Sequence, residues 1–379
     1  MIYADHNATT PVDPEVRAAM AVALEDSFGN ASSLHQAGQE ARRLVERARA
    51  QVANLIGAQP DEIIFTSGGT EADNLAVLGA ARAAGRERTG VVTSAIEHQA
   101  VLAPCKCLQE DGHPVTFLPV DREGRVELGA LADAAKPDVA LFSVMLANNE
   151  TGTIQPVAEV VKAAAACGAL VHTDAVQAAG KLPIDAKSLP VALLSLSSHK
   201  IHGPKGAGAL FVRRGTCLSP LVLGGRQERT LRPGTENVPA IVGFGKACEL
   251  AGARLVADAR RLALLRDRFE AQILARVVGA RVNGGQARLA NTSNIDFHGL
   301  DGEAIAINLD MLGMAVSNGA ACSAADHAPS HVLLAMGQSE TEARSAVRFS
   351  FGRDNSDEDI ERAAELVVRA TTLLRKVRS

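Results

Sequence analysis

Three side chains that can do chemistry stand at or just after the ends of short apolar runs: Lys200, Asp174 and His98. A partly desolvated lysine amine can form a Schiff base with a carbonyl compound. A carboxylate at the end of a buried strand needs a partner, and a protonated ring nitrogen is one candidate. An imidazole can stack on an aromatic ring and move protons. Taken singly, each residue has a plainer explanation: a surface lysine, a helix N-cap and a satisfied buried histidine.

A candidate phosphate-binding turn, TSGGT (66–70), follows another apolar run and opens a helical stretch. Its glycines let backbone N–H groups approach an anion, and a helix N-terminus favours negative charge. The turn matches neither the Walker pattern nor the dinucleotide GxGxxG pattern, which makes a nucleotide-binding protein the weaker alternative. A simple tight turn is the other interpretation. Ser197 and His199 can also bond phosphate, and Gln177, one turn after Asp174, can bond a ring substituent.

These residues follow different strands of one expected sheet. Ligands of a parallel α/β sheet bind beyond the carboxyl ends of its strands, so the residues are expected to share one edge. Pyridoxal 5'-phosphate (PLP) requires a set of binding groups that these residues can provide. They are an anion-binding turn, a strand-end carboxylate, a strand-end lysine and a histidine that can stack on the ring.

A candidate nucleophile, Cys322, lies in SNGAACSAADHAPSHV. Small residues of this kind are typical of an exposed loop, on which a thiol can reach a site and then an acceptor. A buried small apolar residue is the plainer interpretation of a lone cysteine.

The elements that must position these residues alternate between strand and helix from about residue 60 to 215. Several apolar runs lack a polar face, as buried parallel strands do. A long helix is expected over 239–277, followed by a mixture of strands and helices. The prediction is an α/β fold, with a large domain of mostly parallel sheet flanked by helices (12–250) and a smaller α+β domain (1–11 and 251–379). The runs expected as strands are EIIF (62–65), GVVTSA (90–95), VTFLPV (115–120), VALFSVML (139–146), ALVHTDA (169–175), VALLSLS (191–197) and GALFVR (208–213).

The amino-acid composition is consistent with an α/β fold. The chain has 379 residues, 47% hydrophobic and only 3% aromatic, so we expect a core of Ala, Val, Leu and Ile. The net charge of −4 gives no indication of a nucleic-acid partner. No signal peptide or membrane-spanning run is apparent, so we expect a cytoplasmic protein. The six cysteines are scattered and form no zinc pattern, so reduced thiols and no resident metal are expected.

Nine motifs in order, spanning Asp5 to Arg353, resemble the NifS/IscS-type cysteine desulfurases, which are class-V aminotransferase-like, fold-type I PLP enzymes. The motifs are DHNATTPV, TSGGTEADN, EHQAV, NNETGTIQP, HTDAVQAAGK, SSHKIHGPKGAGAL, RPGTEN, SNGAAC and VRFSFGR.

The resemblance implies roles for individual residues. Lys200 would bind PLP covalently, Asp174 would pair with the pyridine nitrogen, Gln177 would bond the ring oxygen and His98 would stack on the ring. Cys322 would receive the sulfur as a persulfide. The phosphate would be held by Gly69, Thr70, Ser197 and His199.

The remaining implied roles concern the substrate and partners. Asn149 and Arg348 would hold the substrate carboxylate, with Arg353 as a second candidate. Thr235 would reach the phosphate of the other subunit, which implies a homodimer.

The implied reaction converts L-cysteine into L-alanine and a persulfide for a sulfur-acceptor protein. That acceptor can be an iron–sulfur scaffold, a tRNA-thiolation protein or a DNA-modification protein, and Cys322 could transiently ligate an iron–sulfur cluster. The alternatives are a selenocysteine lyase, an aminotransferase or another fold-type I enzyme, and a catalytically idle adaptor with a PLP fold.

Overall fold

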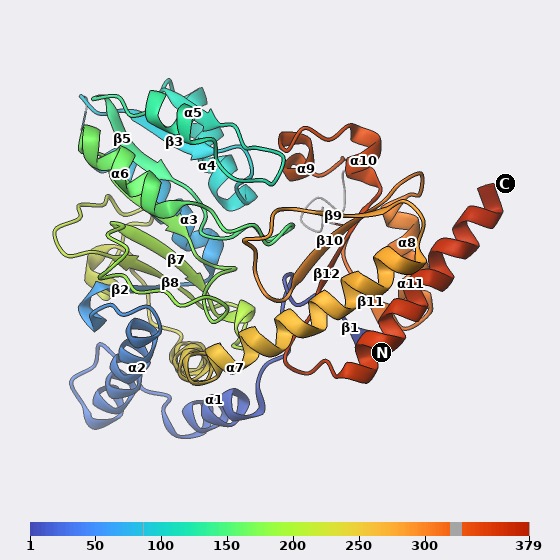
Figure 1. The fold of residues 1–379 in the computed structure, drawn as a ribbon. Helices are drawn as coiled ribbons and strands as arrows, with labels where there is room; N and C mark the ends of the chain where they lie inside the picture. The colour runs from blue at the N-terminus through green and yellow to red at the C-terminus, as the bar shows by residue number, and fades with distance from the viewer. Residues whose placement is uncertain (86, 319–327, 379) are drawn as a thin grey trace.

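A seven-stranded mixed sheet forms the centre of the larger part of the molecule (Figure 1). The structure is a computed structural model and describes residues 1–85, 87–318 and 328–378. All seven apolar runs predicted as strands are strands. In spatial order they are β2 (Ile63–Thr66), β8 (Gly208–Val212), β7 (Leu193–Ser197), β6 (Leu170–Asp174), β5 (Val139–Ser143), β3 (Gly90–Ser94) and β4 (Val115–Leu118). Only β8 runs against its neighbours, so β2, β3, β5, β6 and β7 all end at the same edge.

Apolar residues cover both faces of this sheet, which explains why its strands lack a polar face. Ile64, Leu141 and Leu193 pack on one side with α3 (Gly69–Ala83) and α4 (Gln99–Glu110). Phe142 and Leu194, the residues next to these, point to the other side. There they pack with helices from several parts of the chain. These are α1 (Pro14–Asp26), α2 (Gln36–Leu55), α5 (Leu128–Asp133), α6 (Val157–Cys167) and α7 (Val238–Arg276).

A second hydrophobic core lies in the smaller part, beside an antiparallel sheet of β12 (Ala346–Ser350), β10 (Thr292–Phe297) and β9 (Ala280–Asn283). Four phenylalanines are fully buried there, and the Phe269 ring centroid lies 4.9 Å from that of Phe349. The larger core is mainly aliphatic as expected, whereas this smaller one depends on aromatic packing. The other elements are β1 (Ile2–Tyr3), β11 (Met314–Ala315), α8 (Gly302–Met311), α9 (His331–Ala335), α10 (Glu340–Arg344) and α11 (Asp357–Arg378).

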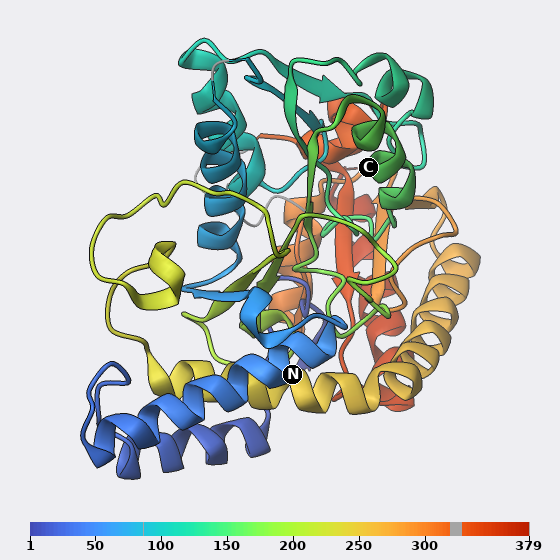
Figure 2. The same cartoon turned by 90° about the vertical axis from the view of Figure 1, so that its left-hand side faces the viewer.

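The 39-residue helix α7 joins the two cores, and Figure 2 shows it running beneath both sheets. Its first half packs closely against α2, and a Cβ placed on Gly245 would lie 2.6 Å from the Ala48 Cα atom. Its second half contributes Leu262 and Phe269 to the smaller core. We propose the domain division expected above, 12–250 against 1–11 with 251–379, with the boundary inside α7.

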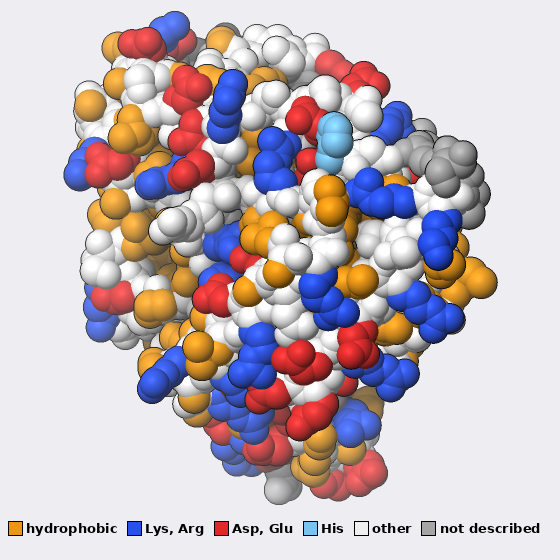
Figure 3. All heavy atoms as spheres, turned by 45° about the vertical axis from the view of Figure 1, so that its right-hand side comes forward, with side chains coloured by type: hydrophobic (Ala, Val, Ile, Leu, Met, Phe, Trp, Pro, Cys, Tyr) orange, Lys and Arg blue, Asp and Glu red, His pale blue; other side chains and the backbone are white. Residues whose placement is uncertain are grey.

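The outer surface mixes both signs of charge. On the face drawn in Figure 3, Lys and Arg side chains alternate with Asp and Glu. Among the described residues, no helix is both long enough and apolar enough to cross a bilayer.

Candidate active site

A cavity of about 800 Å³ opens at the carboxyl edge of the large sheet. It collects side chains that follow β2, β3, β5, β6 and β7, together with residues from the N-terminal segment and from β12. The sequence-predicted residues that line it are Gly69, Thr70, His98, Asn149, Asp174, Gln177, Ser197, His199, Lys200 and Arg348.

Asp174 lies at the end of β6 and is 7% exposed. Its Oδ1 atom accepts a hydrogen bond of 2.8 Å from the backbone N–H of Val176, so the carboxylate caps the turn that follows. Burial raises the pKa of this carboxyl, against the opposing effects of the Val176 amide and the charges of His98 and Lys200. A carboxylate in this position is stabilised by a cation that enters the cavity.

A second buried carboxyl, Asp73 on α3, lies beside Asp174. Burial raises the pKa of Asp73 well above its usual range, and the neighbouring charge of Asp174 raises it further. His172 Nε2 is 3.5 Å from Asp73 Oδ1 and 2.9 Å from the Ser195 hydroxyl. Burial lowers the pKa of His172 to about 3, so this histidine is neutral. Two adjacent carboxyls beside a neutral imidazole favour a shared proton when no cation is near.

Lys200 ends a short 3₁₀ turn, Ser198–Lys200, directly after β7. Its Nζ atom donates to the carbonyl oxygens of Asn7, at 2.5 Å, and Ala8, at 2.8 Å. Two backbone acceptors hold the ammonium group at the cavity wall. The N-terminal segment therefore positions the lysine, although the two lie about 190 residues apart in the chain.

The predicted phosphate ligands gather around the N-terminus of α3. Gly69 and Thr70 open this helix, while Ser197 and His199 face the cavity from the end of β7. Backbone packing is tight here, because a Cβ on Gly208 would lie 2.6 Å from the Gly68 Cα atom. The turn therefore presents a helix N-terminus and hydroxyl groups to an anion.

His98 is the N-cap of α4. Its Nδ1 atom accepts a hydrogen bond of 3.1 Å from the backbone N–H of Ala100, so Nδ1 carries no proton. The cap and the cavity-facing role are compatible, because capping fixes the imidazole while the ring lines the cavity. The structure therefore shows a capping role for this histidine, and its predicted role beside the cofactor ring stays a prediction.

Arg348 projects into the cavity from β12 and is 3% exposed. Its Nη2 atom pairs with Asp5 Oδ1 at 2.8 Å, and Nη1 donates to the Asn149 carbonyl at 3.0 Å. The buried Nε–H has no acceptor among the described residues. An unsatisfied buried guanidinium donor is costly.

Three predicted residues do not line the cavity in the described structure. Thr235 is exposed and lies outside it. Arg353 also lies outside, because its guanidinium pairs with Asp13 at the N-cap of α1, so the structure gives no support to its predicted contact with the substrate. Cys322 falls outside the described residues.

Several lining or neighbouring residues were not predicted, and four of them are polar groups close to the predicted ones. Asn7 lies at the centre of the site: its side chain bonds the Asn149 carbonyl at 3.2 Å, and its own carbonyl accepts from Lys200 and Gln177. Asp73 and Glu150 line the cavity, and Lys181 contacts Gln177 from behind. All four belong to motifs quoted above. Their spacing in the sequence does not single them out, and the only signal that could have found them is a charged or amide side chain.

The donor set fits PLP. Asp174 suits a protonated ring nitrogen, the helix N-terminus suits a phosphate, and the amine of Lys200 suits an aldehyde. Arg348 lines the same cavity, and a guanidinium is a group that suits a carboxylate.

Known proteins can now be compared with this geometry. The class-V aminotransferase family matches residues 2–363. A cysteine desulfurase of Sinorhizobium fredii is 49% identical over 100% of this chain and 98% of its own length. A cysteine desulfurase of Gluconacetobacter diazotrophicus is 47% identical over 99% of this chain and 94% of its own. A solved NifS-like protein superposes with a TM-score of 0.93 at 37% identity, over 98% of this chain and 100% of that one.

The chain belongs to the cysteine desulfurases of the class-V aminotransferase family. Desulfurases of this family use PLP, and the predicted fold class, a fold-type I α/β enzyme, is confirmed.

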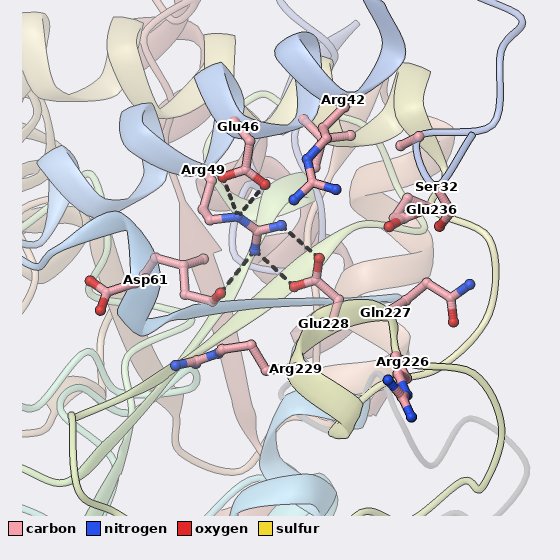
Figure 4. Close-up of a pocket in the computed structure, with 13 residues that line it drawn as sticks. Ser32, Arg42, Glu46, Arg49, Asp61, Arg226, Gln227, Glu228, Arg229 and Glu236 are labelled. Atoms are coloured by element: carbon pink, nitrogen blue, oxygen red, sulfur yellow. Dashed lines mark hydrogen bonds and ion pairs between the residues drawn. The ribbon is translucent and has the colours of Figure 1, made fainter. Parts of the chain in front are cut away.

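The desulfurase has a second cavity of about 620 Å³ between α2 and the segment before α7 (Figure 4). Arg49 makes a two-pronged ion pair there with Glu228, at 2.7 and 2.8 Å, and Glu228 also accepts from the Phe65 backbone N–H. Glu228, Arg229 and Thr230 all have positive φ, of 42°, 55° and 66°. This run is strained for residues other than glycine, so the ion pair holds an unfavourable backbone in place.

Replacing Glu228 by Gln should lower the free energy of unfolding by about 3 kcal/mol, because it leaves a buried guanidinium without its counterion. The side chains of Arg49 and Glu228 are 11% and 3% exposed. Denaturant unfolding followed by circular dichroism measures the change. Glu46→Gln removes the other carboxylate of Arg49, which is 52% exposed, and should cost less than about 1 kcal/mol. Equal losses of unfolding free energy in the two variants would contradict a stabilising role of the Arg49–Glu228 ion pair.

Proposed function

We propose that this desulfurase moves sulfur from L-cysteine to Cys322, with Lys200 anchoring PLP and Arg348 binding the substrate carboxylate. The observation that carries the proposal is the convergence on one cavity of Lys200, which follows β7, Asp174, at the end of β6, and Arg348, within β12. Each group supplies one requirement of the reaction: an amine, a counterion for the ring and a carboxylate anchor.

Asp174, Gln177 and His98 would hold the cofactor ring, and Lys200 would bind its aldehyde carbon. When bound, PLP supplies an electron sink for the bonds around the substrate Cα atom. Asp174 keeps a proton on the ring nitrogen, because a cation beside this buried carboxylate offsets the cost of burial. Gly69, Thr70, Ser197 and His199 would bind the phosphate at the N-terminus of α3.

Lys200 would also move the proton of the substrate. Arg348 and Asn149 fix the carboxylate and thereby the direction of the Cα–H bond. The Lys200 amine accepts the Cα proton once it is no longer bonded to the cofactor. The carbonyl groups of Asn7 and Ala8, which accept from Nζ, keep the amine near the cavity through this change.

Cys322 would take the sulfur. Its thiolate forms an S–S bond with the substrate sulfur while the substrate Cβ–Sγ bond breaks, and protonation at Cβ completes L-alanine. Described residues on both sides of Cys322 lie at the cavity. The backbone of Ser317 exchanges hydrogen bonds of 2.7 and 3.2 Å with Arg348, and Ala328 lines the wall. Six Cα–Cα steps separate residue 322 from Ala328, and six extended residues span at most about 20 Å, which limits the distance of position 322 from the cavity wall.

The same proposal includes a homodimer and a sulfur-acceptor protein. Thr235 is exposed and lies away from the cavity of its own chain, as expected if it completes the phosphate site of a second copy. The acceptor would take the terminal sulfur of the Cys322 persulfide by thiol exchange.

Lys200→Ala should abolish the visible absorbance that appears when PLP is added to the cofactor-free protein, because the covalent bond to the aldehyde is lost. Lys205→Ala is the matched control, since this exposed lysine lies five residues on. It should retain the full absorbance. A normal visible band in Lys200→Ala would overturn the assignment.

Cys322→Ser should still bind PLP and cysteine but should lose persulfide formation and at least 100-fold of alanine production, because the hydroxyl cannot accept the sulfur. Persulfide is measured by alkylation and mass spectrometry, and alanine by chromatography. Cys217→Ser, at an exposed free cysteine, serves as the control and should behave as the parent protein. Normal alanine and sulfide formation by Cys322→Ser would indicate direct elimination instead.

A further inference from the structure

A second lysine, Lys181, lies directly behind the cofactor-binding residues. It is partly buried and follows the turn that begins at Asp174. Its Nζ atom donates to Gln177 Oε1 at 2.8 Å and to Asn7 Oδ1 at 3.2 Å. The reaction proposed above assigns no task to this amine.

The first consequence concerns the orientation of the Gln177 amide. Nζ of Lys181 donates to the amide, so the end of the amide that contacts Lys181 is the oxygen. The other end, Nε2, donates to the Asn7 carbonyl at 2.8 Å and has a second hydrogen. Gln177 lines the cavity, so this amide can present only a donor to a ring oxygen. Lys181 and the Asn7 carbonyl therefore hold the amide in this orientation together, one at each end.

The second consequence concerns charge. Lys181 and Lys200 both donate to Asn7, one to its side chain and the other to its carbonyl. The charged or titratable groups that face Lys181 are Lys200, Arg348, His6 and His199. Burial lowers the pKa of Lys181 to about 7, and the charges of Lys200 and Arg348 act in the same direction. Burial also lowers the pKa values of His6 and His199, to about 3 and about 4, so both are neutral near pH 7.

We propose that Lys181 is a positioning residue for the cofactor site: together with the Asn7 carbonyl it holds Gln177 as a hydrogen-bond donor toward the ring oxygen, and it places a second cation beside Lys200. The inference rests on the proposed roles of Lys200 and Gln177. Both effects disfavour a proton on the nitrogen of Lys200. A neighbouring cation repels that proton, and a donor to the ring oxygen makes the oxygen a weaker acceptor for it.

The test is a pH titration of the visible spectrum of the PLP-loaded protein. Removing the amine in Lys181→Met should raise the midpoint of the spectral change by roughly one pH unit, because the proton on the Lys200 nitrogen becomes easier to retain. Lys181→Arg keeps a donor-only cation and should restore the midpoint to near that of the parent protein. Lys205→Met removes an exposed cation from the loop after Lys200 and should leave the midpoint within a few tenths of a unit.

An unchanged midpoint in Lys181→Met, with a normal visible band and a normal circular dichroism spectrum, would overturn the inference. If the Met variant does not fold, Lys181→Gln gives the same readout with a polar side chain. An unchanged midpoint in that variant would also contradict the inference. The outcome is separable from the test of Lys200. A band that survives in Lys200→Ala refutes the cofactor anchor, whereas a band that is lost there but titrates normally in Lys181→Met refutes only the role of Lys181.

Discussion

The active site depends on the carboxylate of Asp174, which is held in a buried position where its negative charge is energetically unfavourable. Asp174 is buried at the end of β6, beside a second buried carboxyl, Asp73, and a neutral histidine, His172. Such an arrangement favours protonated carboxyls until a cation arrives. In the proposed function a protonated ring nitrogen would be that cation, so the buried carboxylate would favour a cofactor that can accept electrons.

The large sheet makes this arrangement possible. Six strands run in the same direction and end at one edge, so residues scattered between 66 and 200 that follow five of them meet within a single cavity. The residue proposed to bind the substrate comes from another sheet, because Arg348 lies on β12. Asn7 joins the two parts through bonds to Asn149, Thr292 and Lys200. The site therefore requires both hydrophobic cores to be formed and fixed relative to each other.

Much of the fold and of the candidate site could be predicted from the sequence, because buried strands and the polar residues at their ends have local sequence patterns. The seven apolar runs and the long helix α7 were predicted to within a few residues. The antiparallel direction of β8 was not, since strand direction depends on pairing between distant segments. The connecting role of Asn7 was missed for the same reason: its partners Thr292 and Asn291 lie more than 280 residues away. Arg353 was placed at the substrate because of its motif, but its neighbour in space is Asp13.

The central claim is that one particular amine, Lys200, carries the cofactor although another buried amine lies beside it. The most direct measurement is borohydride reduction of the PLP-loaded protein, followed by proteolysis and peptide mass spectrometry. The account predicts that the reduced cofactor is attached to the peptide that contains Lys200, at Lys200 itself. Attachment at Lys181 or Lys205 would contradict it.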